Sequence, residues 1–336
     1  MPARKITLLL IACCISYAPI FAQADTVTYA EKLGFPKGAK VLILHVDDVG
    51  MSYDSNKGAI DALEKGIASS ASVMMPCPWV PAFVHYLKQH PNTDAGLHLT
   101  LTSEWNEYRW PPLSGKPAVP GLVDSEGALW PEVEDVVKHA SADEVETEIR
   151  AQVERAIQMG FQPTHLDSHM GTLFALPAYM ERYIKVGISY KIPVMFPGGH
   201  NTSIAQQNKM VATSMESIRQ TGKLIWNAGL PVLDDLHSVD YGTPLPKGVT
   251  PTSANRAKYK VAQFKTELKA LKPGLTMIIM HCTYPTEVFE HISASGPGRK
   301  ADLDAMLSPE LKAFIQKEGI IITTWRELKQ RRDKVL

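Results

Sequence analysis

Short apolar segments rich in β-branched side chains alternate along this chain with longer segments in which apolar residues recur at helical spacing. Runs of about four to eight apolar residues bounded by turn residues are typical of buried strands. The strand-like segments are residues 41–45, 70–75, 95–101, 165–168, 193–196, 275–281 and 320–324, with residues 230–233 as a weaker candidate.

The segments between these strands carry signals of helix starts and ends. Ser141 and Glu144 form a capping box, and apolar residues follow at every fourth position until Gly160 ends the helix. Residues 261–271 show helical periodicity before a proline, and Ser308, followed by proline, starts another helix. Strands that alternate with helices predict a mostly parallel sheet.

The number of these units predicts an α/β fold, namely an irregular (β/α) barrel of about seven parallel strands. An open doubly wound sheet is the alternative. The chain contains no glycine-rich dinucleotide fingerprint and no phosphate-binding loop, which weighs against the nucleotide-binding forms of that alternative. Because there is no internal repeat or low-complexity linker, we expect residues 25–336 to form a single domain.

The first 24 residues have the anatomy of a secretory signal peptide. A short basic front precedes a mostly apolar segment, residues 6–21, and a small-x-small cleavage site ends at Ala24. A membrane anchor is a weaker interpretation, because Pro19 interrupts a segment shorter than the roughly 20 residues of a span. A lipoprotein signal ending at Cys13 is a minor alternative. We therefore expect an exported protein, periplasmic or secreted, with no transmembrane segment after cleavage.

Charge and cysteine content narrow the possible partners. Lys and Arg together number 35, as do Asp and Glu; residues 1–24 hold two basic and no acidic side chains, so the remainder carries a net charge of −2. A nearly neutral chain lacks the electrostatic footprint of a nucleic-acid-binding protein. Only Cys77 and Cys282 remain after cleavage, and they form either one disulfide or two separate thiols. Nothing in the sequence indicates an oligomeric state.

Residues 102–130 form a long connection that contains several prolines and aromatic residues. Loops of this length inside compact domains are usually functional or disordered. Trp105 and Trp110 in this loop have two interpretations: they stack on sugar rings, or they pin the loop to the barrel.

Carboxylates stand at the end of the first predicted strand. In parallel β/α folds the chemistry gathers where the strands end. Asp47 and Asp48 lie at that point, and the turn at Gly50 allows both to face the barrel mouth although neighbours on a strand point apart. Two adjacent carboxylates on a buried strand need a partner of opposite charge or access to solvent.

Histidines lie within or at the ends of three other predicted strands. His98 lies within the third strand, His165 and His169 flank the end of the fourth, and His281 ends the strand 275–281. Two imidazoles and one carboxylate are a common ligand set for Zn²⁺, or for another divalent ion such as Mg²⁺. Such an ion is the positive partner that the two carboxylates require.

Four segments resemble the motifs of the YdjC-like carbohydrate deacetylases, a family within the polysaccharide-deacetylase superfamily. They are HVDDVGMS (residues 45–52), AGLHLTL (95–101), THLDSH (164–169) and MHCTYP (280–285), and the similarity continues in order to about residue 306. The resemblance implies an irregular β/α barrel with a divalent ion held by Asp-His-His. Carried over by motif, Asp48, His98 and His169 would be the metal ligands, Asp47 the general base and His281 the general acid.

Each of three further residues, His165, Asp167 and Arg299, has two interpretations. His165 competes with His169 as a ligand, but we interpret it as structural because it lies deeper in the strand. Asp167 orients a ligand histidine or is a turn residue. Arg299 binds a catalytic carboxylate or lies on the surface.

Three positions depart from the pattern of the family. His45 stands where the family often has asparagine, the usual second histidine after residue 169 is replaced by Met170-Gly171, and the usual His-Pro becomes residues 281–285. We expect these departures to affect which substrate the protein binds more than the type of reaction that it catalyses. His237, which follows the weak strand candidate and two carboxylates, is an alternative general acid to His281.

The resemblance implies hydrolytic removal of an acetyl group from an N-acetylated or O-acetylated sugar. A metal-dependent amidase or esterase that acts on a glycolipid or another acylated substrate is the first alternative. A catalytically disabled sugar-binding protein is the second, although binding alone does not require a base, an acid and a ligand set. The native ion, the sugar and its chain length are not indicated by the sequence.

Overall fold

The computed structural model describes residues 27–208, 212–238 and 245–335 of the 336-residue chain. The expected signal peptide, residues 1–24, and its alternatives lie outside the described residues. Within those residues, no helix combines the length and the apolar character needed to cross a bilayer.

Seven parallel strands form one sheet in the order β4-β3-β2-β1-β6-β5, and β7 pairs with the first residues of β1. The strands are β1 (Lys40–Val49), β2 (Ser70–Val73), β3 (Ala95–Leu99), β4 (Leu166–Ser168), β5 (Asp235–Ser238), β6 (Gly274–Met280) and β7 (Ile321–Ile322). The longest strand, β1, is central and pairs with β6 from Lys40 to Val46 without a break in register. Its carboxyl end therefore lies in the middle of the sheet.

The sheet curls into a half-barrel whose two edges are connected by isolated bridges. Leu166 of β4 bridges Val194, and Pro197 bridges Leu233, which lies just before β5; both bridges are parallel. The prediction of an irregular barrel with about seven parallel strands in a single α/β domain is therefore confirmed. The irregularity lies in this connection, where single bridges replace a full strand.

Two strand predictions were displaced. The segment 193–196 is reduced to the bridge at Val194, and the segment 230–233 precedes the strand, because β5 begins at Asp235. The side chain of Asp235 accepts hydrogen bonds from the backbone N–H groups of Ser203 and Ile204, so this buried carboxylate has donors within the protein. A strand that begins with such a hydrogen-bonded carboxylate lacks the run of apolar residues by which strands are predicted from the sequence.

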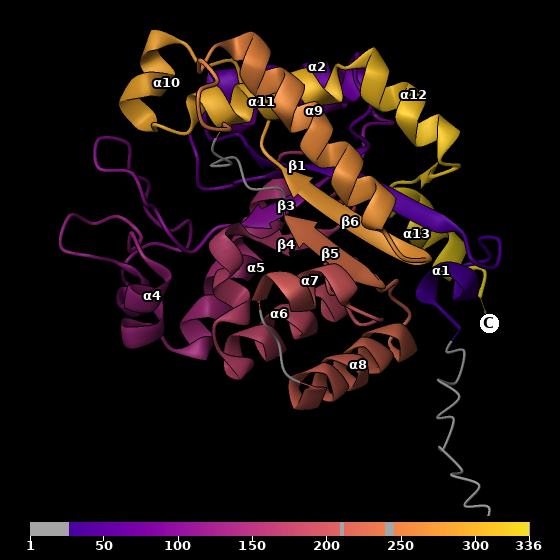
Figure 1. Ribbon diagram of the computed structural model, residues 1–336. Coiled ribbons are helices and arrows are strands. Elements are labelled where there is room, and N and C mark those ends of the chain that lie inside the picture. Colours follow the sequence, from indigo (N-terminus) through magenta and orange to yellow (C-terminus); the bar gives the residue numbers. More distant parts are fainter. Residues whose placement is uncertain (1–26, 209–211, 239–244, 336) are drawn as a thin grey trace, which may run out of the picture.

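Helices surround the sheet on both sides (Figure 1). They are α1 (Tyr29–Lys32), α2 (Tyr53–Glu64), α3 (Val80–Gln89), α4 (Val133–His139), α5 (Ala142–Gln158), α6 (Pro177–Tyr190), α7 (Thr202–Asn208), α8 (Ala212–Asn227), α9 (Ser253–Ala270), α10 (Glu287–Ile292), α11 (Gly296–Met306), α12 (Pro309–Lys317) and α13 (Trp325–Arg332), with 3₁₀ helices η1 (Pro120–Leu122) and η2 (His169–Phe174). Figure 1 shows α9, α11 and α12 on one side and α5, α6 and α8 on the other. The capping box of Ser141 and Glu144 forms at the start of α5, as predicted.

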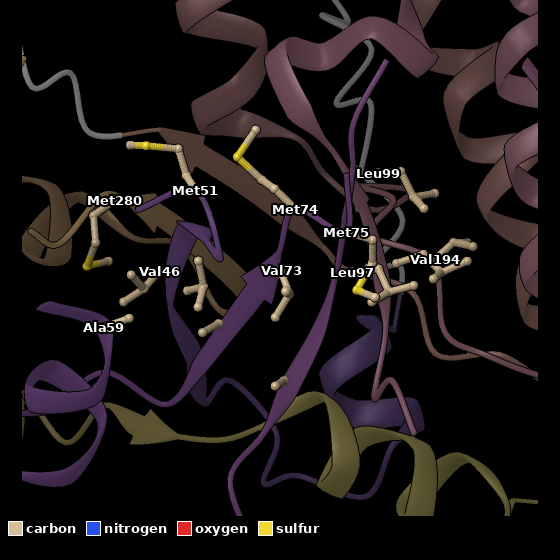
Figure 2. Packing of buried hydrophobic residues seen from close by; sticks show 14 of the residues in the cluster. Val46, Met51, Ala59, Val73, Met74, Met75, Leu97, Leu99, Val194 and Met280 are labelled. Atoms are coloured by element: carbon tan, nitrogen blue, oxygen red, sulfur yellow. The ribbon is translucent and has the colours of Figure 1, made fainter. Parts of the chain in front are cut away.

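Apolar side chains from neighbouring strands pack into one large buried cluster. Val46 of β1, Val73 of β2, Leu97 of β3 and Val194 belong to it (Figure 2). Each is fully buried, and full burial of such a side chain contributes about 1.5–3 kcal/mol. Because β1 is buried from its second residue to its last, each polar side chain on it requires a partner within the protein.

Candidate metal centre and active site

A bulge at the end of β1 turns its two carboxylates toward the same histidine. The pairing of β1 with β2 shifts register between Val46 and Val49, and Asp48 adopts a left-handed backbone conformation with φ of 61°. His98 Nε2 consequently lies 3.7 Å from Asp47 Oδ2 and 3.4 Å from Asp48 Oδ1. A non-glycine residue in this conformation costs about 1–3 kcal/mol, and such strain is concentrated at functional sites.

Asp48, His98 and His169 form a group whose ligand atoms all lie within 4.8 Å of one another. Asp48 Oδ1 is 3.3 Å from His169 Nδ1, and all three side chains are buried. Asp48 Oδ1 accepts no hydrogen bond from any described residue, although it is buried and faces two imidazole nitrogens. A buried oxygen without a donor, beside two imidazoles, fits a divalent cation.

A carboxylate holds the far nitrogen of each of these two imidazoles. His98 Nδ1 is 2.6 Å from Asp167 Oδ1, and His169 Nε2 is 3.0 Å from Glu104 Oε1. Metal-ligating histidines are commonly oriented in this way, with the second nitrogen donating to a carboxylate. The arrangement leaves His98 Nε2 and His169 Nδ1 directed at Asp48. Glu104 was not among the residues predicted from the sequence.

The two imidazoles of this group are surrounded by an excess of carboxylates. Burial opposes a charge on His169, but Glu104 and Asp48 outweigh it and raise its pKa to about 9. Burial likewise opposes a charge on His98, and Asp47 and Asp167 raise its pKa well above the ordinary value. A cation held between the rings would balance this excess of carboxylates and keep both imidazoles neutral.

Two other combinations of the same residue types are close enough to hold an ion, namely His45 with His165 and Asp167, and Asp47 with His98 and Asp167. Both use Asp167, whose oxygens are already engaged in hydrogen bonds to His98 and His45. The group of Asp48, His98 and His169 is favoured because its inward atoms are not engaged in this way.

Arg299 on α11 fixes the other oxygen of Asp48. The Nη1 atom of Arg299 donates to Asp48 Oδ2 over 2.6 Å, and its Nε donates to Ser295 Oγ over 2.7 Å. Burial opposes the charge on Asp48, but Arg299 and His281 hold its pKa well below the ordinary value. Arg299 is buried, so the alternative of a surface arginine does not apply.

Asp47 is held by His45 and Ser72. His45 Nε2 lies 3.0 Å from Asp47 Oδ1 and 3.0 Å from Asp167 Oδ2, and Ser72 Oγ donates to Asp47 Oδ1 over 3.2 Å. Burial opposes a charge on His45, whereas Asp167 and Asp47 raise its pKa to about 9. His45, to which the sequence assigned no role, thus bridges Asp47 and the carboxylate that orients His98.

His281 follows β6 and completes the group at the mouth of the barrel. Its Nε2 lies 3.8 Å from Asp48 Oδ2, and its backbone N–H donates to Asp302 Oδ2 over 3.1 Å. Burial and the neighbouring Arg299 lower its pKa to about 4, against the opposing effect of Asp48. The ring is therefore neutral near pH 7 in this environment.

A comparison with known protein families matches the part of the chain that contains the candidate site. Residues 41–317 match the family model described as YdjC-like protein. The chain belongs to this family. A relative from Thermus thermophilus named carbohydrate deacetylase is 30% identical over 300 residues, which cover 89% of this chain and 97% of the relative. Another protein of that name, from Brevibacillus brevis, is 27% identical over 85% of this chain and 99% of its own.

A solved structure from Enterococcus faecalis, of a proposed cellobiose-phosphate cleavage protein, shares the fold of this YdjC-like chain. Its TM-score is 0.68 at 19% identity, and the match covers 86% of this chain and 99% of that one. A chitooligosaccharide deacetylase from Yersinia enterocolitica is 33% identical over 135 residues, which are 39% of this chain and 49% of the relative.

Two further histidines of the YdjC-like chain lie outside the group around Asp48. His165 is buried, stacks on Trp325 with ring centroids 5.1 Å apart, and lies 3.5 Å from Asp167. A Cβ atom on Gly96 would come within 2.4 Å of the His165 ring, so the glycine of the second motif makes room for it. His237 contacts Glu267 of α9 at 3.4 Å, and this contact turns it toward a surrounding helix.

The two tryptophans of the long loop differ in exposure. Trp110 is buried and its indole N–H donates to the backbone oxygen of Thr102, so it pins the loop to the barrel and offers no face to a sugar. Trp105 is partly buried and packs against Trp110 with ring centroids 5.5 Å apart. Cys77 and Cys282 are separate buried thiols, the second of the two possibilities left open by the sequence.

Proposed function

We propose that this YdjC-like protein removes an acetyl group from an acetylated carbohydrate by hydrolysis that depends on a divalent ion. The observation that carries the proposal is the buried group of Asp48, His98 and His169, in which one oxygen lacks a donor and each imidazole is held by a carboxylate. The names of the relatives from Thermus thermophilus and Brevibacillus brevis support the carbohydrate substrate. Zn²⁺ is the ion we expect from this ligand set.

The side chains around the candidate ion site have different roles in the proposed reaction. A divalent ion in this position supplies the positive charge that acidifies water and polarises an acyl oxygen. Asp47 takes a proton from the attacking water, because its Oδ1 is fixed by His45 and Ser72 while its Oδ2 faces His98. Arg299 holds Asp48 in place from the side away from the imidazoles.

His281 follows β6, the strand next to β1, and lies beside Asp48, so we assign it the transfer of a proton to the leaving group. Because its pKa of about 4 leaves the ring neutral near pH 7, His281 takes this proton from solvent before it passes it on, and the proton that Asp47 takes from the attacking water returns to solvent when the products leave. On the sequence grounds given above, we also expect the protein to be exported after removal of residues 1–24.

Acetate release from a panel of N-acetylated and O-acetylated sugars tests the proposal, using a chain that starts at Asp25 and is supplied with Zn²⁺. We expect release from at least one sugar, loss of activity with a chelator, and a decrease of at least about a hundredfold in Asp47→Asn, because a general base contributes about 10²–10⁴-fold. Asp143→Asn, an exposed carboxylate on α5, is the matched control.

Two results would overturn the proposal. If no sugar in the panel releases acetate while other acyl esters or amides are cleaved, the protein is an amidase or esterase of another class. If Asp47→Asn binds sugars as the wild type does and neither variant turns them over, the chain is a sugar-binding protein.

A further inference from the structure

Two side chains on one face of α11 contact the ends of the two central strands. Arg299 and Asp302 are three residues apart on this helix and therefore lie on the same face. Arg299 Nη1 donates to Asp48 Oδ2 near the end of β1 over 2.6 Å. Asp302 Oδ2 accepts a hydrogen bond of 3.1 Å from the backbone N–H of His281, directly after β6. Because β1 and β6 are paired, this one helix fixes Asp48 and His281 relative to each other.

The segment that follows His281 is in close contact with two helices. The backbone oxygen of Arg299 on α11 accepts a hydrogen bond of 3.4 Å from the N–H of Thr283. A Cβ atom on Gly58 of α2 would come within 2.5 Å of the backbone oxygen of Cys282, so α2 lies directly against this segment. The position of His281 is therefore set by the helices around it, and Asp302 is the side chain that α11 contributes.

Asp302 also forms a buried ion pair with Lys260 of α9, the helix that packs against α11 (Figure 1). Lys260 Nζ lies 3.1 Å from Asp302 Oδ1, Lys260 is only 5% exposed, and Asp302 is fully buried. Burial raises the pKa of Asp302 to about 6, although Lys260 acts against this rise. Lys260 thus favours the ionised carboxylate, which is the stronger acceptor for the N–H of His281.

Stability alone does not account for this ion pair. Taking two charges out of water costs about as much as their attraction returns, and apolar side chains of similar volume are often equally stable in their place. An apolar pair could not accept the hydrogen bond from the His281 N–H. The contribution that only the polar pair makes is therefore the position of His281.

We propose that Asp302, held by Lys260, is a positioning residue for His281 and sets the place of its imidazole relative to Asp48. This inference rests on the proposed function, in which His281 passes a proton to the leaving group. His281 Nε2 lies 3.8 Å from Asp48 Oδ2, so a shift of the backbone at His281 moves the ring relative to the reacting atoms. A displacement of about 1 Å in a catalytic group can lower the rate about a hundredfold.

Two double variants separate this role from a contribution to stability. Asp302→Asn/Lys260→Met removes both charges and retains a side-chain oxygen that can accept from the His281 N–H, whereas Asp302→Leu/Lys260→Met removes that acceptor as well. Neither leaves an unpaired buried charge, so we expect both to fold, and urea unfolding checks this. Glu310→Leu/Lys265→Met is the control, because it removes an exposed ion pair between the same helix α9 and α12.

The kinetic readout is the ratio of kcat for an N-acetylated sugar to kcat for para-nitrophenyl acetate, with Zn²⁺ supplied. The amine of the sugar needs a proton in order to leave, whereas para-nitrophenolate does not. We expect Asp302→Leu/Lys260→Met to lower this ratio about 10–100-fold with little change in KM of the sugar, and Asp302→Asn/Lys260→Met to keep it within about threefold of the wild type. A general loss of folded protein or of metal would lower both rates and leave the ratio unchanged.

Hydrogen exchange at the backbone amide of His281 gives a readout that does not need activity. With isotope-labelled histidine, and the signal assigned through His281→Gln, this amide should exchange at least about tenfold faster in Asp302→Leu/Lys260→Met than in Asp302→Asn/Lys260→Met. If the wild type is active, equal kcat ratios in the two double variants would overturn the inference while the proposed function stands. If the wild type releases acetate from no sugar, the proposed reaction fails, and equal exchange rates at His281 would overturn the inference as well.

Discussion

Glu104 allows the metal centre to be tested with little disturbance of the fold. Its side chain is 17% exposed on the long loop, and it holds His169 Nε2 at 3.0 and 3.1 Å through its two oxygens. Asp167 has the same function for His98, but it is almost fully buried and contacts three histidines, so its replacement would also destabilise the protein. Glu104 is therefore the cleaner position.

The expected size of the effect follows from what each substitution leaves behind. Loss of a carboxylate that orients a ligand histidine typically lowers metal affinity by about 10–100-fold. In Glu104→Gln the amide oxygen can still accept from His169 Nε2–H, so we expect a decrease of about tenfold, or about 1.4 kcal/mol. In Glu104→Ala no acceptor remains, and we expect a decrease of about a hundredfold, or about 2.7 kcal/mol.

Competition with a chromophoric chelator at fixed pH measures the dissociation constant of Zn²⁺ for each variant. Glu126→Gln is the control, because Glu126 lies on the same loop, is 67% exposed and, among the residues that the structure describes, has an ion pair only with Arg109. The order wild type, Glu104→Gln, Glu104→Ala is the predicted ranking of affinity. Affinity in Glu104→Ala within about twofold of the control would refute the inference that His169 is a ligand oriented by Glu104.

Three further predictions concern other parts of the molecule. His45→Ala should lower kcat by about 10–100-fold with little change in KM, because a methyl group cannot bridge Asp47 and Asp167 and the base loses its position. Ser141→Ala should lower the free energy of unfolding in urea by about 1 kcal/mol and leave the specific activity unchanged, because it removes only the capping box of α5. The thiols of Cys77 and Cys282 should fail to react with a disulfide reagent in the native protein and react fully in denaturant, since both are buried.

Strands of the sheet were predicted correctly where their residues are mostly apolar, and they were misplaced where their residues are more polar. β1 and β6 contain runs of mostly buried apolar residues, at positions 41–44 and 277–280, and were found from the sequence. β5 was not, because its apolar content is low and its first residue, Asp235, is a buried carboxylate that accepts hydrogen bonds from backbone N–H groups of α7. Asp234 just before it accepts hydrogen bonds from Tyr29, Ala30 and Leu275, contacts that no local pattern reveals.

The candidate site was predictable to the extent that its residues lie in motifs. Asp48, His98 and His169 each lie in a recognisable motif, and the structure brings them together; their role as ligands stays a prediction. The partners of these residues were harder to find, because the contact of Glu104 with His169 spans 65 residues and that of His45 with Asp167 spans 122. Such pairs follow from how the strands and the long loop are placed, which is a property of the whole fold.

One titration tests the central claim most directly. Protein freed of metal is titrated with Zn²⁺ while acetate release from an N-acetylated oligosaccharide is followed in the same samples. We predict that activity rises from near zero to a plateau at one ion per chain, and that His98→Ala shows no such rise. Activity that is the same with and without added ion, or a wild type that remains inactive at every ratio of ion to chain, would contradict the account.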